Sequence, residues 1–271
     1  MRFGWFWSWR AGAFALLVVI GLSATILSGQ ARSETCTIPS GHAGVPFSTN
    51  DVDPDWACRL HAIVSDYTIA NKVGPIRAGL SESVYRALLD RPPLAAALIN
   101  RLDLGLYKSE ARGPGRFWGD DGEGTQGIVE LVYEDRTFRI YYLEGSHDSR
   151  LLPQITGKAV VFLKMDPVKG VDGTDAMDST MVSYAKLNNR FLSGVVSLLR
   201  PFIKGAVNRK LSKGVETVNQ LSRVMRQEPD RVLFEAMDPP ALPDDDVAFV
   251  KQALANLAHP GGANVTRMPS P

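Results

Sequence analysis

Apolar residues recur every three or four positions over residues 201–227 and predict one long amphipathic helix. The stripe consists of Ile203, Val207, Leu211, Val215, Val218, Leu221 and Met225. Pro201 suits a first helical turn, where its missing N–H costs nothing, and Pro229 ends the run because it pushes Glu228 out of the α region. A stripe of this length must pack on something, and we expect it to lie across a sheet.

After residue 104 the spacing of apolar residues changes from every three or four positions to every second position. This alternation predicts neighbouring antiparallel strands with one covered face. The predicted strands cover residues 106–112, 128–134, 137–144, 158–165 and 179–187. Residues 113–127 are rich in glycine and are expected to form a connection. Within the strands, we expect Phe138, Ile140 and Tyr142 to point inward.

Helices are predicted before these strands. Asp53 and Pro54 supply a cap and a first position for one helix, and Ser81 caps a second that Pro92 and Pro93 break. A third helix is expected over residues 94–102, and a short one over residues 190–199 leads into the long helix. Helices, then a run of strands, then a long helix indicate the α+β class.

This order of elements resembles the START-like helix-grip superfamily, also called the polyketide cyclase, Bet v 1-like or SRPBCC group. Residues 84–90 resemble the helix that follows the first strand in that family, and residues 179–190 resemble its last strand and the entry to its grip helix. The resemblance covers roughly residues 74–227 and rests on element order. The family's first strand should precede Ser81, where Gly74 and Pro75 interrupt the pattern, so we expect a short or edge strand.

The resemblance implies a curved antiparallel sheet wrapped around the long C-terminal helix, with a cavity between them for a hydrophobic ligand such as a lipid, sterol or aromatic polyketide. The candidate cavity residues are Trp118, Val129, Leu131, Tyr133, Phe138, Ile140, Tyr142, Val161, Leu163, Ile203, Val207 and Leu211. Residues 116–118 form either a lid on a flexible loop or a small satellite core. Gly205 and Gly214 in the long helix make room either for a ligand or for a close strand.

The N-terminus predicts export. Arg2 and Arg10 flank an aromatic cluster, and residues 11–28 carry no charge. This is typical of a signal peptide, with cleavage after Ser33 as one interpretation. An uncleaved inner-membrane anchor is the other, because the apolar run approaches the roughly 20 residues that a membrane span needs. Either interpretation places the folded part outside the cytoplasm, most simply in a bacterial periplasm.

The two cysteines support that compartment. Cys36 and Cys58 both follow the export segment, and in an oxidising compartment such a pair usually forms a disulfide. Two free thiols, or a metal site with His42 and His61, are the alternatives, but the spacing matches no familiar zinc pattern.

Charge gives little information about partners. The net charge of +1 gives no indication of nucleic-acid binding. The long helix is strongly basic, which suits either a solvated face or a surface that meets anionic lipid. The membrane-surface candidates are Lys204, Arg209, Lys210 and Lys213. The acidic residues over 228–246 are expected to fold back on the helix and neutralise it.

No catalytic or cofactor motif stands out. Ser146, His147 and Asp148 are adjacent and cannot converge as nucleophile, base and orienter, so we interpret them as a polar turn. The aspartates over residues 166–178 do not have the spacing of a calcium loop, and no glycine-rich stretch carries a phosphate-loop lysine. We therefore predict neither a metal nor a cofactor.

Four parts are predicted: a signal or anchor (residues 1–33), a loop and helix (34–73), the helix-grip domain (74–228), and an acidic segment with a disordered tail (229–271). The first functional hypothesis is an exported, non-enzymatic binder or carrier of a hydrophobic molecule. The alternatives are a cyclase-like or hydrolase-like enzyme acting on such a molecule, and an envelope interaction domain without a cavity.

Overall fold

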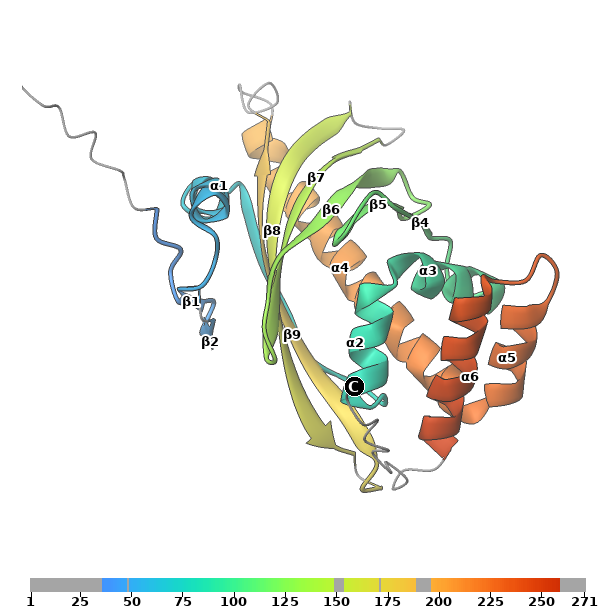
Figure 1. Ribbon diagram of the computed structural model, residues 1–271. Helices are drawn as coiled ribbons and strands as arrows, with labels where there is room; N and C mark the ends of the chain where they lie inside the picture. The colour runs from blue at the N-terminus through green and yellow to red at the C-terminus, as the bar shows by residue number, and fades with distance from the viewer. Residues whose placement is uncertain (1–35, 48, 149–153, 171, 189–195, 259–271) are drawn as a thin grey trace, which may run out of the picture. The chain divides into compact units, whose positions relative to one another are not determined.

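A seven-stranded antiparallel sheet organises the computed structural model (Figure 1), which describes the chain except for residues 1–35, 48, 149–153, 171, 189–195 and 259–271. The strands lie in the order β3-β9-β8-β7-β6-β5-β4. They are β3 (Ile69–Ala78), β4 (Lys108–Ala111), β5 (Arg116–Asp120), β6 (Thr125–Glu134), β7 (Phe138–His147), β8 (Ile155–Lys169) and β9 (Asp175–Leu187).

The helices and one small hairpin cover this sheet. They are α1 (Pro54–Val64), α2 (Glu82–Asp90), α3 (Pro92–Arg101), α4 (Val196–Gln227), α5 (Pro229–Met237), α6 (Asp244–Ala258), and the hairpin of β1 (Gly41–His42) and β2 (Val45–Pro46). The order from β3 to α4 is one strand, two helices, six strands and a long helix. This order confirms the predicted α+β class, with an antiparallel sheet and a long C-terminal helix.

The two faces of the sheet are defined by the alternation of side chains along each strand. On the inner face, Tyr141, Leu163 and Met181 pack in one cluster with Leu221 and Met225 of α4. On the outer face, the alternate residues pack in a second cluster with α1. This second cluster includes Phe138, Ile140, Tyr142, Val160 and Phe162. The sheet therefore separates two apolar cores rather than covering one.

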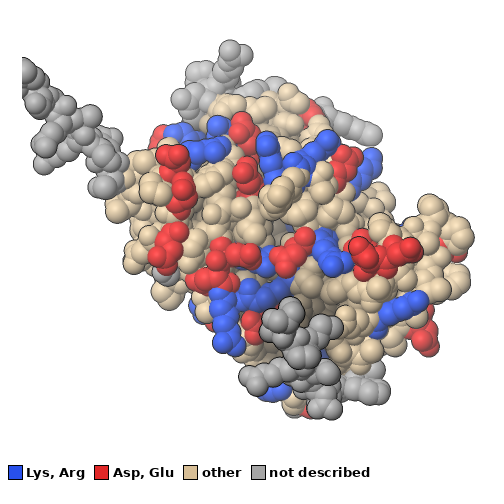
Figure 2. Space-filling model, viewed as in Figure 1, with Lys and Arg blue, Asp and Glu red and all other residues tan. Residues whose placement is uncertain are grey.

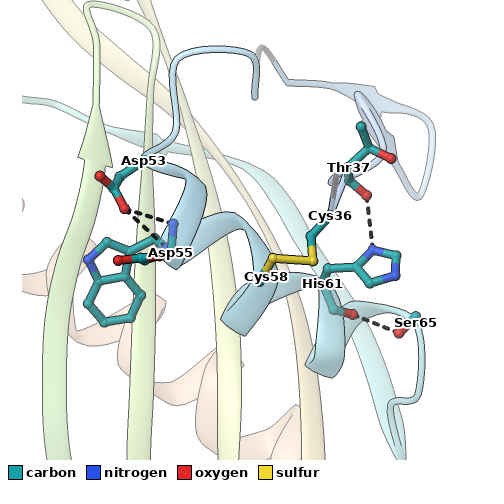
Figure 3. Close-up of a disulfide and its surroundings, with 8 residues drawn as sticks. Cys36, Thr37, Asp53, Asp55, Cys58, His61 and Ser65 are labelled. Carbon is teal, nitrogen blue, oxygen red and sulfur yellow. Dashed lines mark hydrogen bonds between the residues drawn. A yellow bond between two sulfur atoms is a disulfide. The ribbon is translucent and has the colours of Figure 1, made fainter. Parts of the chain in front are cut away.

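The outer core is closed by the N-terminal segment. Asp53 caps α1 by accepting hydrogen bonds from the amides of Asp55 and Trp56, and Pro54 occupies the first turn. A disulfide joins Cys36 to Cys58 of α1, as predicted, and His61 bonds the carbonyl of Thr37 at 2.9 Å (Figure 3). These contacts tie the incoming chain to α1, and the apolar residues of α1 pack against the sheet.

A buried histidine completes the outer core. The ring of His42 stacks on Phe162 with centroids 4.0 Å apart, and its Nδ1 lies 3.2 Å from the hydroxyl of Tyr184. Burial lowers the pKa of His42, only partly offset by a hydrogen bond with the Pro39 backbone. Inside this apolar cluster the imidazole is therefore held in its neutral form.

The inner core is densest at the end of the sheet that carries α2, α3, α5 and α6. Met165 and Met177 of the sheet, Leu221 and Met225 of α4 and Val232 of α5 are all fully buried there. The helices α5 and α6 lie beside α3 and the C-terminal end of α4 (Figure 1). The apolar stripe at the C-terminal end of α4 is thus buried in this core, while Glu216 and Arg223 on the same helix remain exposed.

Glycines mark where the sheet bends at its other end. Gly119, Gly127, Gly145 and Gly157 pair in register across four neighbouring strands, on the inner face. A Cβ at Gly127 would lie 2.5 Å from the carbonyl oxygen of Glu144 and 2.7 Å from the Cα of Gly145. Only glycine permits so close an approach of two backbones, so this row allows the strong curvature seen in Figure 1.

Several predicted elements need correction. Residues 116–120 form strand β5 inside the expected connection, which removes the idea that Arg116, Phe117 and Trp118 sit on a flexible lid. The helix α4 begins at Val196, so Pro201 lies in its second turn rather than its first, and the short helix expected over residues 190–199 merges with it where the chain is described. The interrupted first strand is β3, an edge strand whose register shifts between Val73 and Ile76.

The predicted division of the chain also changes. The strand β3 begins at Ile69, before the expected boundary at residue 74. The acidic segment after residue 228 forms α5 and α6, whose apolar residues join the inner core. Among the described residues, no helix has the length and apolar character to span a membrane. The predicted signal or anchor and the predicted tail after residue 258 lie outside the described residues.

Candidate ligand-binding site

The candidate site lies between the inner face of the sheet and the part of α4 that precedes the dense core. Of the predicted cavity residues, Val129 and Leu131 of β6 and Val161 of β8 point to this side, and each remains partly exposed to solvent. Leu163, closer to the dense core, is buried, and Leu211 of α4 is partly exposed. The side chains of the predicted residues Ile203 and Val207 lie outside the described residues.

Burial decreases along α4 toward its N-terminal end. Met225 and Leu221 are 1% and 2% exposed, whereas Val218 and Leu211, on the same stripe, are only partly buried. Gly214 also lies on this stripe, three residues after Leu211 and four before Val218. A Cβ added at Gly214 would meet no heavy atom within 4 Å apart from the helix's own neighbouring backbone. Open space therefore adjoins the apolar stripe of α4 at this point.

Four predicted cavity residues lie on the wrong face. Phe138, Ile140 and Tyr142 belong to the outer core with α1, and Tyr133 stacks on Phe138 there. The sequence pattern correctly separated the two faces of β7 but assigned them the wrong way round. Tyr141 and Leu143, at the alternate positions of β7, are the ones on the inner face.

Trp118 is also on the outer face. It pairs with Ile128 of β6 and Glu110 of β4, both on the side away from α4. Phe117, the next residue, points to the inner face opposite Val129 and is the aromatic residue of β5 that the candidate site contains. Sequence reasoning missed this assignment because residues 116–120 were not recognised as a strand.

Buried polar groups line the boundary between the dense core and the candidate site. The hydroxyl of Tyr85 lies 2.7 Å from the hydroxyl of Ser179, and Arg139 pairs with Asp90 at 2.7 Å and Glu134 at 3.0 Å. Burial raises the pKa of both Tyr85 and Tyr141, against the lowering effect of the Arg139 charge. Both phenols are therefore neutral hydrogen-bonding groups, and this arrangement anchors α2 to the sheet.

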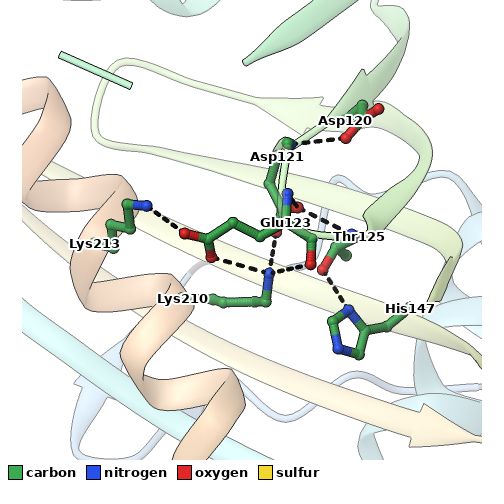
Figure 4. A network of polar contacts seen from close by, with 8 residues as sticks. Asp120, Asp121, Glu123, Thr125, His147, Lys210 and Lys213 are labelled. Atoms are coloured by element: carbon green, nitrogen blue, oxygen red, sulfur yellow. Dashed lines mark hydrogen bonds and ion pairs between the residues drawn. The ribbon is translucent and has the colours of Figure 1, made fainter. Parts of the chain in front are cut away.

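A network of ion pairs, which we call the strap, joins α4 to the β5–β6 loop (Figure 4). Lys210 binds the carboxylates of Asp121 and Glu123, and Lys213 binds Glu123. Burial alone would raise the pKa of Asp121, but Lys210 and the amides of Thr125 and Glu123 outweigh it and lower the value. The bond to Lys213 lowers the pKa of Glu123. Both carboxylates are therefore charged at neutral pH.

Two of the four membrane-surface candidates belong to the strap. Lys210 and Lys213 are paired with acids of the sheet, while Arg209 is exposed and the side chain of Lys204 lies outside the described residues. Among the described side chains, the bases of α4 pair with Asp121, Glu123, Glu216 and Asp172, not with the acidic segment after residue 228. Figure 2 shows the two signs of charge intermixed on the face in view.

The triad residue types Ser146, His147 and Asp148 do not converge in the structure. Ser146 and His147 point to opposite faces of β7, and His147 lies 3.0 Å from the hydroxyl of Thr125 rather than from a serine. Over the described ranges, no three histidine, cysteine or acidic side chains gather in a way that holds a metal ion. The inner face presents apolar side chains with a few hydroxyl and imidazole groups at its curved end.

Comparison with known proteins finds similarity only at the level of structure. No family model matches the chain, and no curated protein matches it in sequence. A conserved protein from Geobacillus kaustophilus is 13% identical, with a TM-score of 0.36, over 57% of this chain and 93% of that one.

Two further solved structures are similar in the same range. Ara h 8.0201 is 14% identical with a TM-score of 0.33, over 57% of this chain and 95% of that one. The di-domain ARO/CYC BexL from the BE-7585A biosynthetic pathway is 14% identical with a TM-score of 0.34, over 62% of this chain and 57% of that one. These values are too low to carry a functional argument. The order of the chain's own strands and helices gives it the helix-grip architecture that the sequence resembles.

Proposed function

We propose that this protein is an exported domain that binds or carries a hydrophobic molecule, such as a lipid, between the inner face of its sheet and α4. The observation that carries the proposal is the open space beside Gly214, on the stripe of α4 that continues into the buried core. A space there, next to partly exposed apolar residues of β6 and β8, is the arrangement in which an apolar ligand gains most from burial.

The proposed lining also supplies orientation. Sites for small molecules are mostly apolar with a few placed polar groups. Val129, Leu131 and Val161 provide the apolar wall, and Thr125 and His147 provide hydrogen-bonding groups near the strap. We therefore expect an amphiphile whose polar end lies toward the strap and whose apolar part lies toward Leu163.

Export is supported independently of the ligand. Disulfides persist in oxidising compartments, and Cys36–Cys58 closes the outer core of the folded part. The uncharged run over residues 11–28, preceded by basic and aromatic residues, supports a signal peptide or anchor. Both features favour a periplasmic location for the folded part.

Gly214 provides a direct test. The full chain is purified, bound lipids are extracted and identified by mass spectrometry, and the experiment is repeated with Gly214→Leu and with Gly214→Ala as the matched control. If the space is a ligand site, leucine fills it and the retained lipid falls at least tenfold. Alanine leaves most of the space and improves helix propensity by about 1 kcal/mol, so lipid retention stays and stability rises.

The outcome also separates this proposal from a domain without a cavity. A tightly packed interior would make Gly214→Leu destabilising by about 1–3 kcal/mol, as overpacking does. That result, or a wild-type protein that neither retains nor exchanges an apolar molecule, contradicts the proposed function.

A further inference from the structure

The outer face of the sheet is covered by α1 along only part of its length. The apolar outer residues of β7 end at Tyr142, and the following outer positions are Glu144 and Ser146. Their neighbours on β8 are Lys158 and Thr156. The outer face thus changes from an apolar core to a polar surface within one strand, at the row of glycines where the sheet bends.

This polar surface is hollowed. A depression of about 450 Å³ lies over the outer ends of β5 to β8. Its lining includes Trp118, Gln126, Glu144, Ser146, Thr156 and Lys158. We call it the polar groove. Its volume falls within the range of small-molecule sites.

A second depression adjoins the polar groove and lies among the β4 end of the sheet, the β5–β6 loop and α3. It has a volume of about 440 Å³ and shares Gln126 with the first. Its lining includes Tyr107, Lys108, Asp120 and Asp148. The two together cross several strands, which suits a chain-like ligand better than a compact one.

The side chains of the polar groove are positioned before any ligand arrives. The hydroxyl of Tyr142 donates to Glu144 at 2.9 Å, and Lys158 lies 3.6 Å from the same carboxylate. Thr156 accepts a hydrogen bond from the amide of Asn188. Regular strands hold these groups, so little side-chain entropy is lost on binding.

Other groups in the polar groove keep their hydrogen-bonding capacity. Within the described part of the chain, the side chains of Trp118, Gln126 and Ser146 make no hydrogen bond to another residue. An amide and a hydroxyl both donate and accept, and the indole of tryptophan offers a broad apolar face with one N–H donor. These groups match a ligand that has an apolar face surrounded by hydroxyl groups.

The charges of the polar groove favour a neutral ligand. Lys108 and Lys158 lie among Asp120, Glu144 and Asp148, which leaves a net formal charge of only about −1, so neither a polyanion nor a polycation is strongly attracted. A sugar ring is neutral, carries hydroxyls around its rim and presents C–H groups on its face. We propose that the polar groove binds a neutral oligosaccharide, with the face of one sugar ring against Trp118.

The polar groove is separate from the proposed hydrophobic site, because its side chains lie on the outer face of the sheet, away from α4. Binding of an oligosaccharide would bring the domain to a glycan and leave the inner face free to hold its ligand. The two proposals can therefore fail independently.

The test is titration calorimetry on the full chain with three tetrasaccharides: β-1,4-linked glucose, β-1,4-linked N-acetylglucosamine and α-1,4-linked glucose. We expect at least one to bind with a Kd on the order of 0.1–1 mM. Trp118→Ala should weaken that binding at least tenfold, whereas Trp118→Phe should retain it within about threefold because an aromatic face remains. Tyr67→Ala, which removes an exposed aromatic ring elsewhere, is the matched control and should change nothing.

Folding and lipid retention are measured on each variant. If Trp118→Ala does not fold, Ser146→Tyr, which fills the groove without removing the indole, replaces it and should abolish binding. The proposal is overturned if no tetrasaccharide binds at concentrations up to about 10 mM. It is equally overturned if binding occurs but folded groove variants bind as tightly as the wild type.

Discussion

The two faces of the sheet are built from the same strands and packed to different extents. On the outer face, Ile140, Val160 and Phe162 are 0% exposed beneath α1 and the N-terminal hairpin. On the inner face, the alternate residues of the same strands, Tyr141 and Val161, are partly exposed although α4, the longest of the described helices, runs over this face. The short helix therefore closes its face more completely than the long one.

This difference separates the residues that stabilise the fold from the residues of the proposed ligand site. A space beside apolar side chains forfeits contacts that would stabilise the fold. The outer core and the dense end of the inner core supply those contacts elsewhere, so the inner face near Gly214 can remain open. We expect substitutions on the outer face to change mainly stability, and substitutions near the strap to change mainly ligand exchange.

Removing the disulfide gives the largest expected effect. The double variant Cys36→Ser with Cys58→Ser frees a loop that spans a sequence separation of 22 residues, which costs about 3 kcal/mol of unfolding free energy. Chemical denaturation measures the loss, and the wild type in a reducing agent should behave like the variant. If the folded double variant also loses its bound lipid, the two faces are not independent.

Two neighbouring valines compare the faces directly. Val160 points into the outer core and Val161 to the inner face of the same strand. Val160→Ala should cost about 2 kcal/mol, from lost burial plus a residual cavity, whereas Val161→Ala should cost about 1 kcal/mol or less. Urea denaturation of the ligand-free protein measures both. Equal costs would show that the inner face is as tightly packed as the outer.

The buried histidine gives the outer core a pH dependence. Because burial lowers the pKa of His42 in the folded state, the unfolded chain binds a proton more readily. The contribution of neutral His42 to the unfolding free energy is fully present above the pKa of about 6.5 that histidine has in the unfolded chain. It is lost as the pH falls through the lower pKa of the folded state. Denaturation at pH 7.5 and pH 5.5 should show this loss. His42→Phe should reduce it, and an unchanged pH dependence in that variant would assign the effect to other groups.

The sequence alone predicted part of this difference between the two faces of the sheet. The alternation in β6, β7 and β8 predicted the strands, and in β7 and β8 it separated the two faces correctly. In β6 it placed Tyr133 with Val129 and Leu131, whereas a register shift between Leu131 and Tyr133 turns Tyr133 to the outer face. It could not say which face α4 covers, because a sheet buried on both sides carries apolar residues at successive positions, as Ile140, Tyr141 and Tyr142 do. The position of α1 decides the question, and that position depends on contacts distant in sequence.

The elements that were missed carry weaker signals. The strand β5 is five residues long and lies among glycines, so it looks like a connection until its pairing with β6 is known. The helices α5 and α6 did have signals: Pro229 at a first position, and Asp244, Asp245 and Asp246 in a first turn, where negative charge favours a helix. Interpreted as helix starts rather than as an acidic segment, these residues would have extended the predicted domain.

The smallest expected effect concerns the strap. Lys213 and Glu123 are both about half exposed, so Glu123→Gln should change the unfolding free energy by no more than about 1 kcal/mol. The strap nevertheless links α4 to the loop at the curved end of the inner face. If a ligand leaves there, loosening this link should speed its exchange at least threefold while stability is nearly unchanged.

Exchange of a fluorescent fatty acid, followed by stopped flow at low and high salt, measures this effect. High salt should speed exchange in the wild type and have less influence in Glu123→Gln, because the screened interaction is already absent. Glu216→Gln is the matched control: its pair with Arg223 lies within α4 and does not reach the sheet. If both variants exchange at the wild-type rate, the ligand leaves by another route and the strap is only a surface contact between α4 and the sheet.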